Sequence, residues 1–322
     1  MMRLPPFRYL RPRTVAEACR MLSGEGPTAA VVAGGTDLYP NMKRRHQRPR
    51  TVIALGHLGA LRGTDERRIG AGEKLSALEK NPRIRQGWPA LWSAIRTIST
   101  PVLRNMGTIG GNVCLDTRCT YYNQTHEWRR AIHFCMKCDG TTCWVAPSSG
   151  TCLAINSSDT APVLCALGAR LRLESVQGER VIDAKDLFRK DGIHYLSKRP
   201  DEILTDILLP PAEAGRSAYL KLRRRGAFDF PVLGVAVWLQ FEGRIVTGAR
   251  VFLNAVSMSP LEVLGAQEAL LGHELGERSM TAAGDAAFAA AKPMDNADFH
   301  LHWRKEMARR YVLKALEEVR PR

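Results

Sequence analysis

Six of the chain's eight cysteines lie between Cys114 and Cys152, in a stretch of 39 residues. Their spacing is C-x4-C-x15-C-x2-C-x4-C-x8-C, and glycine and serine interrupt the stretch repeatedly. A segment of this composition favours a packed loop over long helices or strands. Four interpretations are open: structural zinc, an iron–sulfur cluster, disulfides, or thiols that only pack.

The cysteine spacing favours some of these interpretations over others, but it does not identify which cysteines would be ligands. Zinc sites use C-x2-C pairs, and Cys135 with Cys138 forms one, but a second pair is missing. An iron–sulfur cluster needs four thiolates and tolerates irregular spacing. Disulfides suit exported proteins, whereas the N-terminus MMRLPPFRYLRPRTV lacks the apolar core of a signal peptide. Some cysteines are simply small buried apolar residues, which explains Cys19 and Cys165 well but does not easily explain six thiols clustered in one segment. A metal or cluster site is therefore expected.

Bulk composition sets the class of protein. With 322 residues, 45% of them apolar, the chain should form two or three globular domains. No apolar stretch approaches the roughly 20 residues of a membrane span, so we expect a cytoplasmic protein with reduced thiols. The net charge of +15 favours an acidic partner, a nucleotide cofactor or an acidic subunit. Nucleic acid is not expected, because the basic cluster at 43–50 has no interleaved aromatic residue.

Hydrophobic patterning predicts an α/β sequence of elements. Thr14 is the expected N-cap of the first helix, with Glu17 three residues later. Pro210 and Pro211 end a strand and mark the best domain boundary. Strands are expected at 29–33, 51–55, 68–71, 179–184, 201–210, 232–241 and 244–256, and helices at 14–22, 74–80, 88–98, 261–271, 279–291 and 300–319. The segment 161–175 is expected to form a short helix and then a strand.

Two double-glycine turns are candidates for anion binding. The segment VVAGGTDL (31–38) reads as a buried strand ending at two glycines, and TIGGN (108–112) repeats the arrangement. Glycine lets backbone approach a ligand closely, and successive free N–H groups bind anions. The two turns together could hold both phosphates of a dinucleotide, although neither matches the GxGxxG pattern or the P-loop.

These motifs together resemble the flavin subunit of the molybdenum hydroxylases, the family of xanthine dehydrogenase and carbon monoxide dehydrogenase. The pairing of AGGTDL with TIGGN is similar to that family's FAD signature. SDTAP (158–162) resembles its Asp-x-x-Pro segment, and YLKLRRRGAFDF (219–230) resembles its Lys-x-x-x-Arg-Arg segment. The likeness covers essentially the whole chain. It implies an α+β fold, with a two-part FAD-binding domain of the vanillyl-alcohol-oxidase/PCMH type and a C-terminal domain of a small antiparallel sheet with a helical layer.

The resemblance also implies domains and site residues. FAD-binding subdomains would occupy 1–58 and 59–212, with a thiol-rich loop at 113–156, and the C-terminal α+β domain 213–322. No catalytic residue is expected on this chain. The residues that would wrap the FAD pyrophosphate are Val31, Val32, Ala33, Gly34, Gly35, Thr36, Asp37 and Leu38, and its second wall would be Thr108, Ile109, Gly110, Gly111 and Asn112. Asp159 would lie near the flavin or its ribityl chain, and Lys221 would contact the flavin. Ile98 and Leu204 would be further FAD contacts.

One departure from the family pattern concerns the thiol-rich loop. In most members TIGGN runs almost directly into the aspartate segment, whereas here about 40 residues intervene. The insertion resembles that of the 4-hydroxybenzoyl-CoA reductases, a branch of the family whose beta subunits hold an extra 4Fe-4S cluster. Ligand spacing in that branch is 16, 8 and 9 residues, which here falls on Cys119, Cys135, Cys143 and Cys152. Cys114 and Cys138 are left out.

The resemblance implies an electron-transfer subunit with one FAD and one 4Fe-4S cluster. Its partners would be a molybdopterin-containing large subunit, which does the substrate chemistry, and a small subunit with two 2Fe-2S clusters. Electrons would flow inward from a low-potential donor such as ferredoxin, for reductive dehydroxylation of 4-hydroxybenzoyl-CoA or a similar aromatic thioester. Two alternatives are a molybdenum hydroxylase acting on another substrate, with electrons flowing outward, and a zinc-loop binding module without a redox role.

Overall fold

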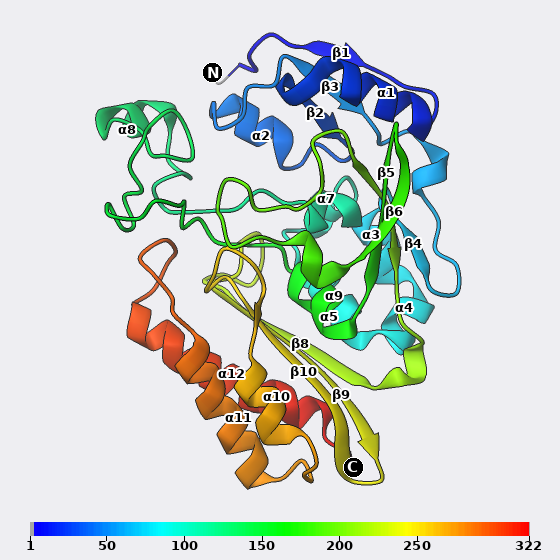
Figure 1. Cartoon of the computed structure of the whole chain (residues 1–322), viewed down its shortest axis with the longest axis vertical. Helices are drawn as coiled ribbons and strands as arrows, with labels where there is room; N and C mark the ends of the chain where they lie inside the picture. Colours follow the sequence, from blue (N-terminus) through cyan, green and yellow to red (C-terminus); the bar gives the residue numbers. More distant parts are fainter. Residues whose placement is uncertain (1–2, 322) are drawn as a thin grey trace.

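The structure, a computed structural model, describes residues 3–321 and contains three sheets that follow one another along the chain (Figure 1). The first sheet is parallel, in the order β1-β3-β2, with β1 (Arg8–Leu10), β2 (Ala29–Val32) and β3 (Thr51–Ala54). Helix α1 (Val15–Glu25) connects β1 to β2. It begins as predicted, because the Oγ1 of Thr14 accepts a hydrogen bond from the Glu17 N–H at 3.1 Å.

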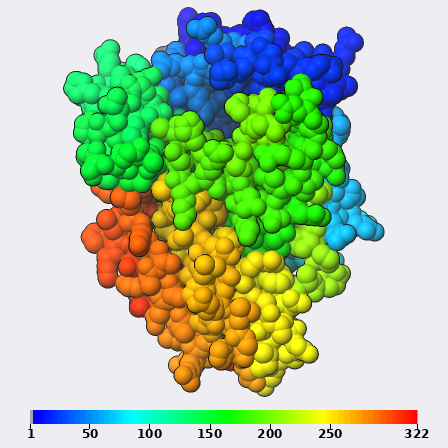
Figure 2. Space-filling view, in the orientation of Figure 1, coloured from blue at the N-terminus to red at the C-terminus, as the bar shows by residue number. Residues whose placement is uncertain are grey.

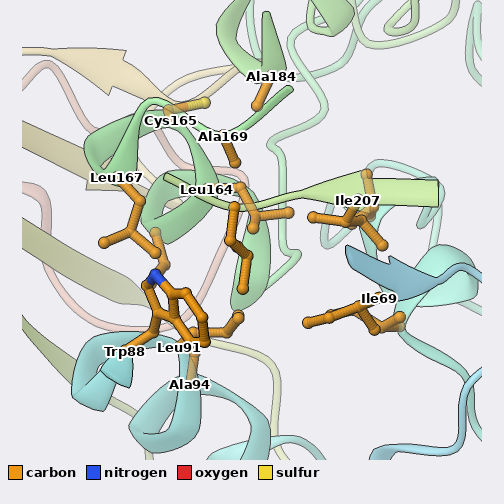
Figure 3. Close-up of a cluster of buried hydrophobic side chains, with 14 of the residues drawn as sticks. Ile69, Trp88, Leu91, Ala94, Leu164, Cys165, Leu167, Ala169, Ala184 and Ile207 are labelled. Carbon is orange, nitrogen blue, oxygen red and sulfur yellow. The ribbon is translucent and has the colours of Figure 1, made fainter. Parts of the chain in front are cut away.

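The second sheet is antiparallel, in the order β4-β7-β5-β6, with β4 (Arg68–Gly70), β5 (Arg170–Ser175), β6 (Gly178–Asp183) and β7 (Ile203–Leu208). The helices of this region are α3 (Leu75–Lys80), α4 (Pro82–Gly87), α5 (Pro89–Thr97), α6 (Pro101–Arg104), α7 (Ile109–Val113) and α9 (Thr160–Leu167). Ile69 and Ile207 from the sheet meet Trp88, Leu91 and Leu164 from the helices in one buried cluster (Figure 3). This cluster is the main core of the middle region.

The third sheet is also antiparallel, in the order β11-β10-β9-β8, with β8 (Arg216–Leu222), β9 (Leu233–Glu242), β10 (Ile245–Asn254) and β11 (Leu261–Glu262). Helices α5 and α9 of the middle region contact this sheet, and so do α10 (Leu264–Leu270) and α12 (Leu301–Val319). Helix α11 (Glu277–Ala290) packs against α10 and α12. Burial from both sides explains why the first seven residues of β9 are continuously buried.

The thiol-rich loop leaves the body between α7 and α9 and contains one helix, α8 (His126–Ala131). In Figures 1 and 2 the part around α8 forms a lobe beside the N-terminal region and above the C-terminal helices. The base of the loop is closed, because Arg118 and Ile155 exchange backbone hydrogen bonds of 2.9 and 2.8 Å. The Thr120 N–H also donates to the Asn296 carbonyl, at 3.0 Å, which ties the loop to the C-terminal region.

Several predicted elements need correction. Strands β1, β8 and β11 and helices α2 (Leu38–Lys43), α4, α6, α7 and α8 were not expected. The helix expected at 261–271 begins only at Leu264, because Leu261 and Glu262 pair with β10. Cys19 and Cys165 are core residues, as predicted. The domain limits at residues 58 and 212 stay a prediction, although each sheet falls within one of the three segments. Among residues 3–321, no helix combines the length and apolar character needed to cross a membrane.

Candidate functional site

A cavity of about 1050 Å³ runs between the first two sheets and reaches the C-terminal region. It is large enough for a sizeable cofactor. Of the seventeen residues predicted to contact FAD, Ile109 does not line it, because its side chain is fully buried in the main core. The other sixteen all line the cavity, namely Val31, Val32, Ala33, Gly34, Gly35, Thr36, Asp37, Leu38, Ile98, Thr108, Gly110, Gly111, Asn112, Asp159, Leu204 and Lys221.

The first glycine turn offers free backbone donors to the cavity. In the described residues 3–321, no protein acceptor is hydrogen-bonded to the N–H groups of residues 34–37. Gly35 has a φ of +72°, and a Cβ on Gly34 would lie 2.1 Å from the Met106 carbonyl oxygen. Both positions therefore require glycine. The expected burial of strand β2 is wrong: only Val32 is buried, because the strand borders the cavity.

The second glycine turn is different, and the expectation that it forms an anion nest is wrong. TIGGN is the start of α7, and Thr108 is the N-cap, accepting from the Gly111 N–H at 3.1 Å. The N–H of Ile109 donates to the Glu73 carbonyl, and that of Gly110 donates to the Ala71 carbonyl. These donors are already used, so this segment presents a close-packed wall to the cavity.

Asn112 joins the two segments that flank the thiol-rich loop. Its Oδ1 accepts hydrogen bonds from the Ser158 hydroxyl (3.0 Å) and from the Thr160 hydroxyl (2.7 Å) and N–H (3.2 Å). All three residues are buried. The amide therefore holds α7 against the start of α9, which keeps the cavity wall continuous across the insertion.

Asp159 and Lys221 form a buried ion pair at the junction with the C-terminal region. Lys221 Nζ lies 2.8 Å from Asp159 Oδ2 and also donates to the Thr97 carbonyl at 3.1 Å. The Tyr219 hydroxyl donates to Asp159 Oδ1 at 2.7 Å. Burial raises the pKa of Asp159 and lowers the pKa of Lys221, while their mutual attraction opposes both shifts. The two predicted residues thus lie together at the cavity wall, each neutralising the other.

Sequence reasoning missed a group of cationic residues on this cavity. Arg118 forms an ion pair with Asp37, donates to Asn41 Oδ1 at 3.0 Å, and stacks over the Phe230 ring at 5.0 Å. Its guanidinium thereby links the loop, the first glycine turn and the C-terminal region. The signal for a further group was the basic segment KRRHQRPR, from which Arg44, Arg48 and Arg50 line the cavity. These charges favour an anionic ligand.

The loop encloses a second, small cavity, lined by the four predicted cysteines Cys119, Cys135, Cys143 and Cys152. The rest of its wall is Tyr121, Tyr122, Met136, Trp144, Val145 and Ala154, together with one charged residue, Lys137. The other two cysteines do not line this cavity: Cys114 lines the large cavity, and the Cys138 sulfur accepts a hydrogen bond from Arg129 Nη1 at 2.9 Å. The four predicted cysteines therefore line one cavity, and Cys138 packs in the same buried cluster as Cys119, Cys135 and Cys152. The choice of four ligands stays a prediction.

The four thiols are shielded from water and lie close enough to influence one another. Burial, with smaller contributions from the neighbouring Cys135 and Cys152, raises the pKa of Cys119 to about 12. Burial also raises the pKa of Cys152 to about 11. Gly192 packs against Cys152, since a Cβ there would lie 2.7 Å from the sulfur. Thiolates at this site would need a bound cation to be stable.

The four thiols do not form a ready-made metal site. Across residues 3–321, no group of three or more His, Cys, Asp or Glu side chains is placed to hold one metal ion. This finding supports neither a mononuclear zinc site nor a 4Fe-4S cluster in the loop. A cluster binds each cysteine to a different iron, so its ligands surround a larger object than one ion.

Comparisons with known proteins cover both halves of the chain. The family described as "FAD binding domain in molybdopterin dehydrogenase" matches residues 5–212. The family described as "CO dehydrogenase flavoprotein C-terminal domain" matches residues 217–319.

Individual relatives are similar over almost their whole length. The carbon monoxide dehydrogenase medium chain of Hydrogenophaga pseudoflava is 27% identical, covering 97% of this chain and 96% of its own. The aldehyde oxidoreductase FAD-binding subunit PaoB of Escherichia coli K12 is 29% identical, covering 98% of both chains. A solved structure of the Hydrogenophaga pseudoflava carbon monoxide dehydrogenase, lacking the Mo-pyranopterin moiety, superposes with a TM-score of 0.81 at 27% identity, covering 99% of this chain and 98% of its own. The first family description and the PaoB name support FAD binding, and none of these names supports a 4Fe-4S cluster on the subunit.

Proposed function

Because the chain belongs to the FAD-binding subunits of the molybdenum hydroxylase family, we propose that it is an electron-transfer subunit carrying one FAD and one 4Fe-4S cluster. Family membership confirms the predicted fold class, a PCMH-type FAD-binding domain followed by an antiparallel sheet with helices. It also supports FAD as the cofactor. The cluster, the partners and the direction of electron flow are the proposed part.

The large cavity suits FAD chemically. The free N–H groups of residues 34–37 and the cationic side chains of Arg44, Arg48 and Arg50 are suited to a pyrophosphate. The Asp159–Lys221 pair lines the same cavity at the junction with the C-terminal region, and this placement supports a role in holding the flavin end. When bound, FAD supplies the exchange between one- and two-electron transfers.

The proposal of a cluster rests on one observation: four cysteines separated by 16, 8 and 9 residues line one small cavity, while the remaining two loop cysteines do not. Their aromatic and aliphatic surroundings exclude water, which is what a cluster site requires to control its potential. Cys119, Cys135, Cys143 and Cys152 would be the ligands. When bound, a 4Fe-4S cluster supplies a one-electron carrier.

The partners proposed are a molybdopterin-containing large subunit and a small subunit with two 2Fe-2S clusters. Two relatives support this, since they are a "medium chain" and an "FAD-binding subunit" of larger enzymes. The substrate site would lie on the large subunit, and a cytoplasmic location is part of the proposal. The basic surface of a chain with a net charge of +15 suits contact with acidic subunits.

The reaction proposed is reductive dehydroxylation of 4-hydroxybenzoyl-CoA or a similar aromatic thioester. Removal of a phenolic hydroxyl consumes electrons, so they would arrive from a low-potential donor such as ferredoxin. The alternative is an oxidising molybdenum hydroxylase acting on another substrate, with electrons leaving through this subunit. The names of the carbon monoxide dehydrogenase and aldehyde oxidoreductase relatives favour that alternative.

Cofactor analysis of the purified complex tests the proposal. With two 2Fe-2S clusters on the small subunit, we expect about eight iron atoms per FAD with the extra cluster and about four without it. A value near four, or zinc in place of iron, would contradict the cluster. Assays with a reduced low-potential donor and 4-hydroxybenzoyl-CoA, against assays with an oxidant and an aldehyde, separate the two directions.

A further inference from the structure

One stretch of chain forms a wall that the two cavities share. Asp116 and Arg118 line the large cavity, and the next residue, Cys119, lines the thiol cavity. Lys137 also lines the thiol cavity and reaches back to this stretch. The partition between the two sites is therefore thin and contains charged side chains.

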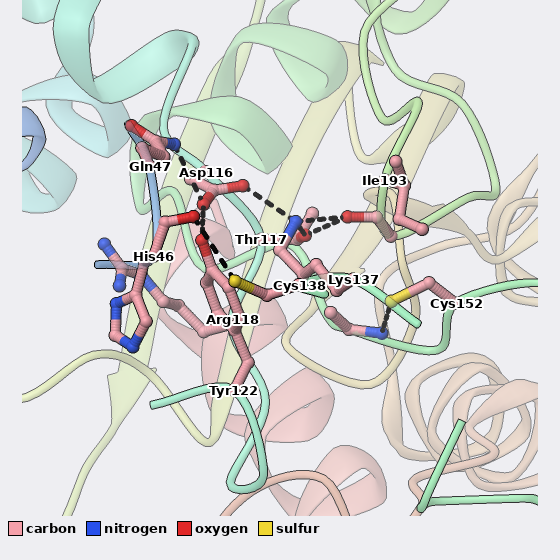
Figure 4. Close-up of polar contacts among 12 residues, drawn as sticks. His46, Gln47, Asp116, Thr117, Arg118, Tyr122, Lys137, Cys138, Cys152 and Ile193 are labelled. Atoms are coloured by element: carbon pink, nitrogen blue, oxygen red, sulfur yellow. Dashed lines mark hydrogen bonds and ion pairs between the residues drawn. The ribbon is translucent and has the colours of Figure 1, made fainter. Parts of the chain in front are cut away.

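A buried ion pair lies inside this partition (Figure 4). Lys137 Nζ is 2.8 Å from Asp116 Oδ1, and the two side chains are only 6% and 5% exposed. The ammonium also donates to the Thr117 hydroxyl at 2.8 Å and to the Gly192 carbonyl. It lies 5.0 Å from the centre of the Tyr122 ring. Such a charge is poorly screened, because water is excluded from it.

Asp116 is held as firmly as its partner. Its Oδ2 accepts from the Tyr122 hydroxyl at 2.9 Å and from Gln47 Nε2 at 3.1 Å. Asp116 lines the large cavity and Lys137 lines the thiol cavity, so the pair is polarised across the wall. The positive end is close enough to the thiol cavity for its charge to oppose the rise in the pKa of Cys152.

The C-x2-C pair explains how Lys137 is placed. The Cys138 N–H donates to the Cys135 carbonyl at 2.8 Å, which makes a tight turn with Met136 and Lys137 at its tip. Cys135 faces the thiol cavity, while Cys138 is held by Arg129 on another side. The turn from Cys135 to Cys138, which resembles a zinc knuckle in sequence, thus places Lys137 at the wall of the thiol cavity.

We propose that Lys137 is a positioning residue that fixes a positive charge beside the four-cysteine site and raises the reduction potential of the group bound there, with Asp116 acting in the opposite sense. The inference rests on the proposed function, since it concerns the proposed cluster. Reduction adds one negative charge to a cluster, and a fixed nearby cation stabilises that charge. A fixed anion destabilises it.

Potentiometric titration of the holo-complex, followed by electron paramagnetic resonance, tests the inference. Lys137→Met should lower the midpoint potential of the cluster relative to the unmodified protein. Asp116→Asn, which has nearly the same shape as the original, should raise it. Lys190→Met removes an exposed lysine and should leave the potential unchanged, because solvent screens that charge.

Opposite shifts are the diagnostic result, since a purely structural disturbance would not change sign with the charge removed. Unchanged potentials in both variants, or shifts in the same direction, overturn the inference. If Lys137→Met does not assemble, the sign of the Asp116→Asn shift decides. Absence of the cluster signal from the unmodified complex overturns the proposed function itself, which distinguishes the two failures.

Discussion

Lys221, on strand β8 of the C-terminal sheet, lies 2.8 Å from Asp159, which comes directly before α9 in the middle region. The two side chains are 2% and 4% exposed, so each charge depends on the other. Removing one partner from a buried pair leaves an uncompensated charge, at a cost of about 3–5 kcal/mol. We expect Lys221→Met to lower the free energy of unfolding by about that amount, measured by urea denaturation.

The double variant Asp159→Asn, Lys221→Met is the matched control for this pair. It removes both charges, so much of the lost stability should return. Equal stability of the single and double variants would show that the two charges do not depend on each other.

Gly34 is the contact point between the first glycine turn and the chain before α7. A methyl group there would lie 2.1 Å from the Met106 carbonyl oxygen, so the two segments must separate. We expect Gly34→Ala to lower the FAD content and to cost about 1–3 kcal/mol in stability. Gly24→Ala is the control, since α1 has open space at that position and should be slightly stabilised. Full FAD occupancy in Gly34→Ala would contradict the close packing.

The two groups of loop cysteines should respond differently to substitution. Cys143 lines the thiol cavity, and Cys143→Ser should remove about four iron atoms and the broad cluster absorbance while FAD remains. Cys138 is directed to Arg129, and Cys138→Ser should keep the iron. Iron analysis and visible spectra of both variants check this. The reverse pattern would show that the ligand assignment is wrong.

His46 should make stability depend on pH in the acidic range. Its ring is buried, stacks on Tyr122 with centroids 4.4 Å apart, and lies near Arg129. Burial and this arginine lower its pKa from 6.5 to about 4. The unfolded chain therefore takes up the proton first, so this group's contribution is present above about pH 6.5 and is lost as pH falls toward about 4.

Urea denaturation at several pH values between about 7 and 4 measures this effect. Other acidic groups also titrate there, so the informative quantity is the difference between the unmodified protein and His46→Gln. The variant should lose less stability on acidification. Parallel pH profiles for the two proteins would contradict the prediction.

Local patterns predicted the parts of the fold that depend on neighbouring residues. The Thr14 cap and the long strands β9 and β10 follow from short-range signals. Strand β1 has only three residues and is stabilised by pairing with distant β3, so no local pattern identifies it. The hydrogen bonds made by the N–H groups of TIGGN could not be predicted from the sequence either, because the carbonyl acceptors of Glu73 and Ala71 come from a separate segment.

In the candidate site, too, the features that depend on local sequence were predicted and those that depend on tertiary contacts were not. Cysteine count and spacing indicated a metal or cluster site, but the physics of spacing did not select four ligands, and only the resemblance to a branch of the family did. Arg118 and Lys137 were missed, since their importance lies in partners brought together by the folded loop. Burial and partner identity are properties of the tertiary structure.

The mutual backbone hydrogen bonds of Arg118 and Ile155 have a consequence for the history of this subunit. They bring the two ends of the insertion side by side, so the chain leaves and re-enters the body at one place. A segment attached in this way can be gained or lost as a cassette, because its closure adds little strain to the scaffold. An ancestor without the insertion could have acquired it while its flavin cleft stayed intact.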